Sequence, residues 1–307
     1  MPEGPEVRRY ADSLHQTLAG KPIITITART KAAKSYLAEN TVHITGKRVE
    51  RVLARGKNLI GLLEDNYYFY SHLMMWGSWH VHLAEAPEIA DRRERARIIV
   101  AGGAAAILLS APIFEVGRGD PLQEIETLRR LGPDILPYPG TGPFADACFR
   151  ERLLSPENRD RAIGAALLDQ TIIAGIGNYL RAEILFVCRI SPFTLVSSLS
   201  SEQLSTLCAA ITLIAERAYA ATGRIVTDEE QERMQNDRSL LYPNASPEWG
   251  GRHYVFRRTN LPCLVCGNPI RQKRQLTHQT VDGDDKERII YFCPQCQNVD
   301  RTAVVTK

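Results

Sequence analysis

The sequence lacks a long apolar segment, a secretion signal and a strong net charge. No uninterrupted apolar run reaches 18 residues, so no membrane-spanning helix is predicted. A secretion signal begins with basic residues followed by an apolar stretch, and the acidic residues Glu3 and Glu6 do not fit this pattern. With 44% hydrophobic and 24% charged residues, the chain resembles ordinary globular proteins. We therefore expect a cytoplasmic protein, long enough for two or more domains and without contact to a membrane.

The net charge of +3 is small, but the charge is unevenly distributed. Residues 252–307 contain ten Lys or Arg and only five Asp or Glu. A basic excess in one segment is typical of a surface that binds a polyanion. The charge alone identifies no particular partner.

The seven cysteines fall into two groups. Three lie singly among apolar residues, where we expect buried thiols: Cys148, Cys188 and Cys208. The other four form two CxxC pairs: Cys263 with Cys266, and Cys293 with Cys296. Two such pairs can offer four thiolates to one tetrahedral Zn²⁺. A redox dithiol is the alternative, although no βαβ pattern surrounds either pair.

The N-terminus suggests a nucleophile. Removal of Met1 would expose Pro2, whose secondary amine lies next to the carboxylate of Glu3. An α-amino group titrates near ~8, so part of it is unprotonated at neutral pH and can attack a sugar carbon, giving an iminium. The alternative is a solvated helix start, with Gly4 as cap and Pro5 in the first turn.

Hydrophobic spacing divides the chain in two. Residues 3–18 have helical spacing, and short β-rich runs follow up to Leu109: 49–52, 59–63, 67–70, 79–83, 97–100 and 106–109. These runs predict a β-sandwich or barrel. A Pro- and Gly-rich stretch at 131–143 predicts a linker. Beyond it we expect helices at 161–173, at 179–187 and from a capping box at Ser200 to Gly223, then an irregular connection at 224–250.

Three motifs occur in one order: Pro2-Glu3-Gly4-Pro5-Glu6, Gly175-Ile176-Gly177-Asn178-Tyr179-Leu180-Arg181 and Cys293-Pro294-Gln295-Cys296. Together they resemble the Fpg/Nei superfamily of DNA glycosylase/AP lyases across nearly the whole chain. The resemblance implies a multidomain α+β protein. Its parts would be an N-terminal β-sandwich domain with flanking helices at 1–130, a linker at 131–149, a helix-two-turns-helix DNA-binding domain at 150–250 and a four-cysteine zinc-finger β-hairpin at 251–307.

The resemblance also implies catalytic roles. Pro2 would attack C1′ of the damaged nucleotide and form a Schiff base, and Glu3 would act as general acid. Glu6 matches a further carboxylate of the active site. Lys57 matches a lysine that contacts a phosphate beside the lesion; the alternative is a turn lysine in solvent.

Asn178, Arg181 and Arg288 match residues that bind DNA phosphates in the family. Without the other motifs, the Gly175–Asn178 turn would be read as a simple helix cap. Arg288 matches the arginine of the zinc hairpin, but the aspartate-containing stretch 279–286 departs from the family pattern.

Met74, Met75 and Trp76 match the loop that fills the space left by an everted nucleotide; the alternative is a buried strand. The stretch 108–115 lacks the Arg-Phe-Gly pattern of the formamidopyrimidine branch. We therefore expect a monomeric base-excision-repair enzyme with one structural Zn²⁺ that acts on damaged DNA, favours oxidised pyrimidines and cleaves the strand by β/δ-elimination. An oxidised-purine glycosylase, a non-catalytic damaged-DNA-binding protein and a zinc-ribbon transcription factor are the alternatives.

Overall fold

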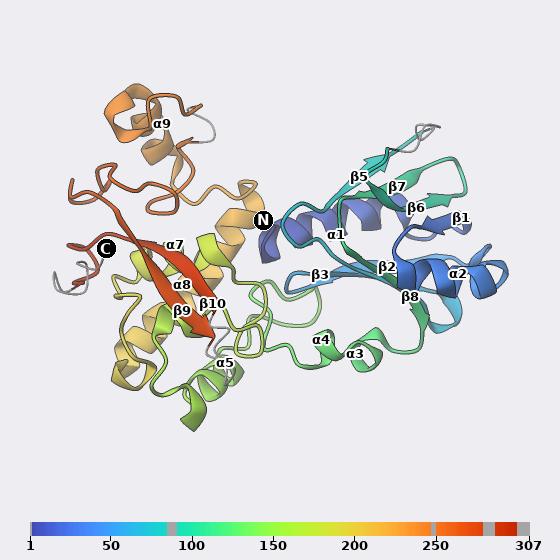
Figure 1. The fold of residues 1–307 in the computed structure, drawn as a ribbon, viewed down its shortest axis with the longest axis horizontal. Coiled ribbons are helices and arrows are strands. Elements are labelled where there is room, and N and C mark those ends of the chain that lie inside the picture. The colour runs from blue at the N-terminus through green and yellow to red at the C-terminus, as the bar shows by residue number, and fades with distance from the viewer. Residues whose placement is uncertain (1, 85–90, 247–249, 279–285, 300–307) are drawn as a thin grey trace. The chain divides into compact units, whose positions relative to one another are not determined.

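The computed structural model describes residues 2–84, 91–246, 250–278 and 286–299 (Figure 1). The chain forms two compact units. The first contains residues 1–131 and 137–142, and the second contains residues 132–136 and 143–307. Within the described residues, no helix is long and apolar enough to cross a membrane.

The first unit combines two sheets with flanking helices. Its helices are α1 (Gly4–Leu18), α2 (Lys31–Ile44), α3 (Pro121–Glu124) and α4 (Glu126–Arg129), with a 3₁₀ turn, η1 (Glu64–Asn66). Its strands are β1 (Ile23–Ala28), β2 (Val49–Arg55), β3 (Asn58–Leu63), β4 (Tyr67–His72), β5 (Ser78–His82), β6 (Glu94–Val100), β7 (Ala105–Leu109) and β8 (Ile113–Arg118).

The strands form two antiparallel four-stranded sheets, ordered β1-β6-β7-β5 and β2-β3-β4-β8. Three aromatic rings join their inner faces. Trp79 on β5 lies 6.2 Å from Phe69 and 6.1 Å from Phe114, measured between ring centroids. Its indole N–H donates to Ser71 Oγ at 3.1 Å, so the polar atom of this buried ring is satisfied. The predicted β-sandwich is confirmed.

The second unit is helical up to a terminal hairpin. Its helices are α5 (Asp146–Leu153), α6 (Ile163–Ala166), α7 (Asn178–Val187), α8 (Ser201–Ala220) and α9 (Asp228–Asn236). The 3₁₀ turns η2 (Pro156–Asn158) and η3 (Val196–Ser198) lie between these helices, and η4 (Arg238–Leu240) follows α9. The strands β9 (Arg271–His278) and β10 (Lys286–Phe292) pair as an antiparallel hairpin. One buried cluster joins residues of α7 and α8 to Ile290 and Phe292 of β10.

Local side-chain chemistry explains where the helices differ from the sequence patterns. The predicted capping box at Ser200 is confirmed: its hydroxyl accepts the backbone N–H of Gln203. The predicted helix at 161–173 is wrong, because only α6 forms there. Asp169 accepts both the N–H and the hydroxyl of Thr171, which favours a turn over a continued helix.

Three further differences concern elements that the patterns do not predict: α9, α2 and β8. A second capping box, between Thr227 and Glu230, starts α9 inside the expected irregular connection. The helix α2 lies within the region of predicted strands and buries only Ala33, Leu37 and Ile44. The strand β8 follows directly after the last predicted strand.

The Pro- and Gly-rich stretch is held by both units. Gly132 N–H donates to Gln170 O at 2.8 Å in the second unit. In the first unit, the Tyr138 ring lies 5.1 Å from the guanidinium carbon of Arg8 and 5.1 Å from that of Arg51. Cation–π contacts of this kind favour a fixed ring. Residues 132–136 thus belong to the second unit and residues 137–142 to the first.

Candidate functional site

The predicted nucleophile stands at the start of α1. Pro2 is half-buried and directly precedes Glu3, whose side chain is buried. Glu3 is the N-cap of α1 and forms a capping box with Glu6. In this box Glu6 Oε2 accepts the backbone N–H of Glu3 at 2.9 Å. Both carboxylates thus lie at the N-terminal end of α1, beside Pro2.

Lys57 occupies a tight turn at the edge of a sheet. The partners Arg55 and Asn58 close a two-residue hairpin around Gly56 and Lys57. Gly56 has a φ of 58°, which favours glycine at the first position of such a turn. The turn presents the half-buried lysine at the end of β2.

The start of α1 and the Lys57 turn lie at the same end of the sandwich. His15 Nδ1 accepts the backbone N–H of Val52 at 3.3 Å, and the residue after α1 pairs with the first residue of β2. The helix α1 and the strand β2 therefore run in opposite directions, so the start of α1 lies toward the end of β2. From His15 to Gly4 the helix spans about 17 Å, and from Val52 to Lys57 the chain also spans about 17 Å. Figure 1 shows the start of α1 near the start of β3.

The predicted wedge residues form an exposed turn between β4 and β5. The exposed fractions are 45% for Met74, 59% for Met75 and 79% for Trp76, so this segment is not a buried strand. The turn is anchored by buried Leu73, whose carbonyl accepts the N–H of Gly77 at 2.8 Å. Met74 has a φ of 53°, a left-handed conformation that costs about 1–3 kcal/mol in a non-glycine residue. Such strain often marks a functional turn.

His72 supports this turn, although the sequence reading does not single it out. Its Nδ1 accepts the backbone N–H of Met74 at 3.1 Å. Burial, with a smaller effect from the charge of Lys57, lowers the pKa of His72 to about 4. The ring is therefore neutral at pH 7 and carries its proton on Nε2. Since His72 at the end of β4 pairs with Asn58 at the start of β3, the turn of Met74 to Trp76 and Lys57 lie at the same end of this sheet.

The four predicted cysteines form one cluster. Their sulfur atoms all lie within 4.8 Å of one another. Cys263 Sγ is 3.8 Å from Cys296 Sγ, and Cys266 Sγ is 3.4 Å from Cys293 Sγ. Four thiolates at a Zn–S distance of about 2.3 Å would stand about 3.8 Å apart at the corners of a tetrahedron. The predicted gathering of the four cysteines is confirmed, and its geometry suits a metal ion.

A basic pocket of about 350 Å³ lies on the second unit. It is lined by Asn178, Phe256, Arg257, Arg274, Glu287, Arg288, Ile289 and Tyr291. The pocket thus joins two predicted phosphate-binding residues that stand 110 positions apart in the sequence. Arg257 and Arg274 add positive charge to the pocket, and the sequence patterns do not predict either as a binding residue. The only sequence signal for them is the excess of basic residues in the C-terminal segment. The three arginines and the amide of Asn178 suit a phosphate-like anion, and they outnumber the single carboxylate, Glu287.

Arg181 does not line this pocket, which contradicts its predicted role in binding DNA directly. Its side chain is fully buried. The guanidinium donates to acceptors within the protein, including Asn178 Oδ1. A group enclosed in this way has no surface to offer to a phosphate.

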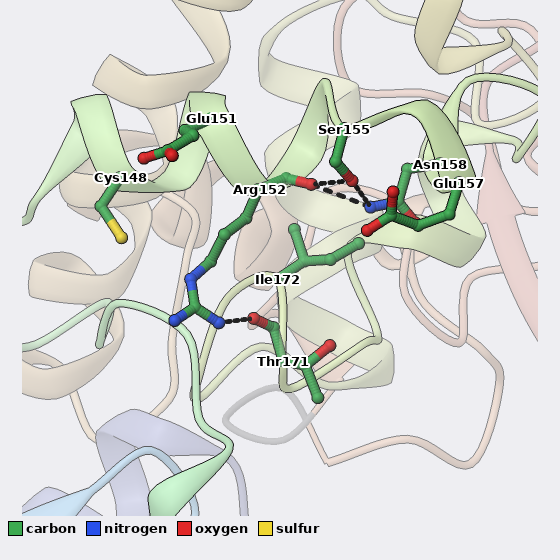
Figure 2. A pocket seen from close by; sticks show the side chains of 8 residues that line it. All are labelled: Cys148, Glu151, Arg152, Ser155, Glu157, Asn158, Thr171 and Ile172. Atoms are coloured by element: carbon green, nitrogen blue, oxygen red, sulfur yellow. Dashed lines mark hydrogen bonds between the residues drawn. The ribbon is translucent and has the colours of Figure 1, made fainter.

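A second cavity, of about 370 Å³, lies beside α5 (Figure 2). Its lining includes the carboxylates of Glu151 and Glu157, which would repel a polyanion. Arg152 Nη1 donates to Thr171 O at 2.6 Å, so this guanidinium faces a protein acceptor. None of the predicted site residues lines the cavity. We therefore do not assign it to the functional site.

The aspartate-containing stretch of the hairpin lies outside the described residues, from 279 to 285.

Comparisons with known proteins give a family for the whole chain. Residues 1–109 match the formamidopyrimidine-DNA glycosylase N-terminal domain, and residues 131–230 match the H2TH domain of the same enzymes. The chain is 33% identical to Endonuclease 8 of Escherichia coli O9:H4 (strain HS) over 299 residues, which are 97% of this chain and 100% of the relative. It is 32% identical to Endonuclease 8 of Pectobacterium atrosepticum over the same shares.

Solved structures show the same fold. A complex of Lactococcus lactis Fpg with DNA containing an abasic site matches with a TM-score of 0.72 and 24% identity, over 96% of this chain and 99% of that one. MutM bound to DNA containing carbocyclic 8-oxo-G matches with a TM-score of 0.71, the same identity and the same coverage. The chain belongs to the Fpg/Nei family of DNA glycosylase/AP lyases, which act in base excision repair.

Proposed function

We propose that this enzyme removes oxidised pyrimidines from DNA through a Schiff base on Pro2, and then cleaves the strand by β- and δ-elimination. The full-length similarity to Endonuclease 8 is the main support for this choice of substrate. The carboxylates of Glu3 and Glu6 at the start of α1 support the choice of Pro2 as the reacting residue. The proposed place of action is the cytoplasm, at the chromosome.

The proposed chemistry uses groups of the first unit. The secondary amine of processed Pro2 forms a bond to C1′ of the damaged nucleotide as the bond from C1′ to the base breaks, and the departing base takes the proton that the amine releases. Glu3 donates a proton to O4′ as the bond from C1′ to O4′ breaks, which assists base removal and leaves the iminium. The resulting iminium withdraws electrons, so loss of a C2′ proton expels the 3′ phosphate, and a second elimination expels the 5′ phosphate. Water then releases the sugar fragment from Pro2.

The connection between β7 and β8 also bears on the substrate. β7 ends at Leu109 and β8 begins at Ile113, so only three residues connect them. Ala111, in the middle of this connection, is buried. The formamidopyrimidine branch carries its Arg-Phe-Gly pattern in this strand-loop unit. The connection is short, and Pro112 is its one exposed residue, which leaves little room for such residues and supports the pyrimidine branch over the purine branch.

We expect excision of oxidised pyrimidines to exceed excision of 8-oxoguanine by tenfold or more, as a pocket built for one base disfavours another by about 1–3 kcal/mol. Single-turnover assays on matched duplexes containing thymine glycol, 5-hydroxycytosine or 8-oxoguanine measure this ratio. Borohydride trapping on the same duplexes reports the Schiff base. Faster excision of 8-oxoguanine would indicate an oxidised-purine glycosylase. Binding to damaged duplexes without a trapped complex would indicate a non-catalytic DNA-binding protein.

We also propose that the four-cysteine cluster holds one Zn²⁺ with a structural role. Cys263, Cys266, Cys293 and Cys296 would supply four thiolates, and a filled tetrahedral site leaves no position for a reacting water. The sulfur separations fit this ion. Gln297, buried beside the cluster, accepts the N–H of Cys293 and donates to Ile190 O, which joins the knuckle to the helical part of the unit.

Metal analysis should find one zinc per chain, and Cys263→Ser should lose it. Because metal binding contributes to folding, this variant should melt at a lower temperature and bind duplex DNA more weakly. Cys148→Ser, which changes a half-buried thiol outside the cluster, is the matched control and should retain its zinc. Zinc-free purified protein, or a Cys263→Ser variant with unaltered DNA binding, would contradict the proposal.

A further inference from the structure

A buried arginine joins the helical turn to the hairpin within the second unit. Arg181 on α7 is 0% exposed. Its Nη2 donates to Asn178 Oδ1 at 2.8 Å and to Ile289 O at 3.0 Å. Its Nη1 donates to Gly164 O at 2.8 Å and to Gln275 Oε1 at 3.1 Å. One planar guanidinium therefore bonds to α6, to the start of α7 and to both strands of the hairpin.

This arrangement fixes the orientation of the Asn178 amide. An asparagine side chain has one acceptor end and one donor end, and either end can turn toward a neighbour. A guanidinium carries only donors, so Arg181 can bond only the Oδ1 end. The Nδ2 end is then the one left for other partners. Asn178 lines the basic pocket together with Arg257 and Arg288.

A DNA phosphate needs this orientation, because its oxygens only accept hydrogen bonds at neutral pH. If the amide were reversed, its carbonyl would repel the phosphate. The bonds from Arg181 to Gly164, Ile289 and Gln275 hold the guanidinium itself in place. Gln275 is in turn held by its bond to Pro192 O at 2.9 Å, and it pairs across the hairpin with Arg288.

We propose that Arg181 is a positioning residue for DNA binding: it holds the Asn178 amide with its donor end toward a backbone phosphate in the basic pocket. This inference rests on the proposed function and adds to it the residue that sets the phosphate contact. Arg181 itself does not contact DNA. Its effect on binding passes through Asn178.

A double-mutant cycle on undamaged duplex DNA tests this route. Asn178→Ala should weaken binding about tenfold or more, as hydrogen bonds to charged groups contribute about 1.5–3 kcal/mol. Arg181→Lys keeps the charge but loses the planar fork of donors. It should weaken binding about tenfold in the natural background and less than about twofold in the Asn178→Ala background. Equal losses in both backgrounds would overturn the proposal. Fluorescence anisotropy measures each dissociation constant.

A second pair of variants keeps Arg181 intact. Asn178→Asp retains an acceptor for Arg181 but replaces the outward donor with an acceptor. It should melt at or above the temperature of the natural protein and bind DNA at least as weakly as Asn178→Ala. Asn178→Asp binding as the natural protein does, or melting as low as Asn178→Ala, would show that the amide is not held in this way.

Arg258 provides a matched control. It is also buried, but its guanidinium donates to Pro262 O and Met234 Sδ. Arg258→Lys should change binding by the same factor in both backgrounds; coupling to Asn178 as strong as that of Arg181 would overturn the proposal. Binding to undamaged duplex requires no chemistry. A protein that binds duplex but is not trapped by borohydride would therefore refute the proposed reaction, while the cycle still decides the role of Arg181.

Discussion

A preparation that retains Met1 will not be trapped on damaged DNA by borohydride. In such a chain the nitrogen of Pro2 is part of a peptide bond and has no lone pair available for attack on C1′. Pro2→Gly exposes a primary amine in place of the secondary one, and should severely reduce both base excision and trapping. Mass spectrometry establishes which N-terminus is present, and gel separation of trapped complexes measures the outcome.

The neighbouring carboxylate offers a control that separates the nucleophile from the acid. Glu3→Gln keeps an acceptor oxygen at the N-cap of α1 but cannot donate a carboxylic proton, so base removal should fall by about 10²–10⁴-fold. Binding to duplex DNA should stay largely intact. Full trapping by protein that retains Met1 would refute the role of Pro2, and excision by Glu3→Gln at the natural rate would refute the role of Glu3.

The sequence predicts those parts of the fold that depend on local chemistry. Short β-rich runs between turn residues are enough to predict most strands of the sandwich. The capping box at Ser200 is enough to start α8. The patterns fail where a distant contact or a side-chain turn decides the structure. A turn in which Asp169 accepts from Thr171 follows α6 where a continued helix is expected, and α2 forms with only three buried side chains.

The same division applies to the site. The CxxC spacing predicts that the four cysteines gather in one place, and their sulfur atoms lie within 4.8 Å of one another. The motif that contains Asn178 and Arg181 cannot show which of the two side chains is enclosed. That depends on β9 and β10, about 100 residues further along the chain, whose acceptors surround Arg181. Cys148 and Cys188, predicted to be buried, are only partly so, since apolar neighbours in sequence do not fix burial in space.

Trp76→Ala should weaken binding to lesion-containing DNA by roughly ten- to a hundredfold, since stacking of a base on an aromatic ring contributes about 1–3 kcal/mol. Everting a nucleotide costs a few kcal/mol of lost stacking, and an inserted apolar side chain offsets that cost. The turn that carries Trp76 is anchored by Leu73 and His72, while the indole is 79% exposed. The protein therefore presents this ring to solvent on a fixed backbone, as a wedge requires.

Because Trp76 is exposed, its removal should leave the melting temperature nearly unchanged, within the small range typical of surface substitutions. Trp79, three residues later, is buried among Phe69 and Phe114, and its loss would instead unfold the sandwich. Val42→Ala, on α2, is a control at an apolar site of similar exposure, 76%, and should not affect DNA binding. Binding of Trp76→Ala to undamaged duplex should change little, and cleavage at a preformed abasic site should survive better than base excision. Equal losses on damaged and undamaged DNA would show that Trp76 supports the fold and is not a wedge.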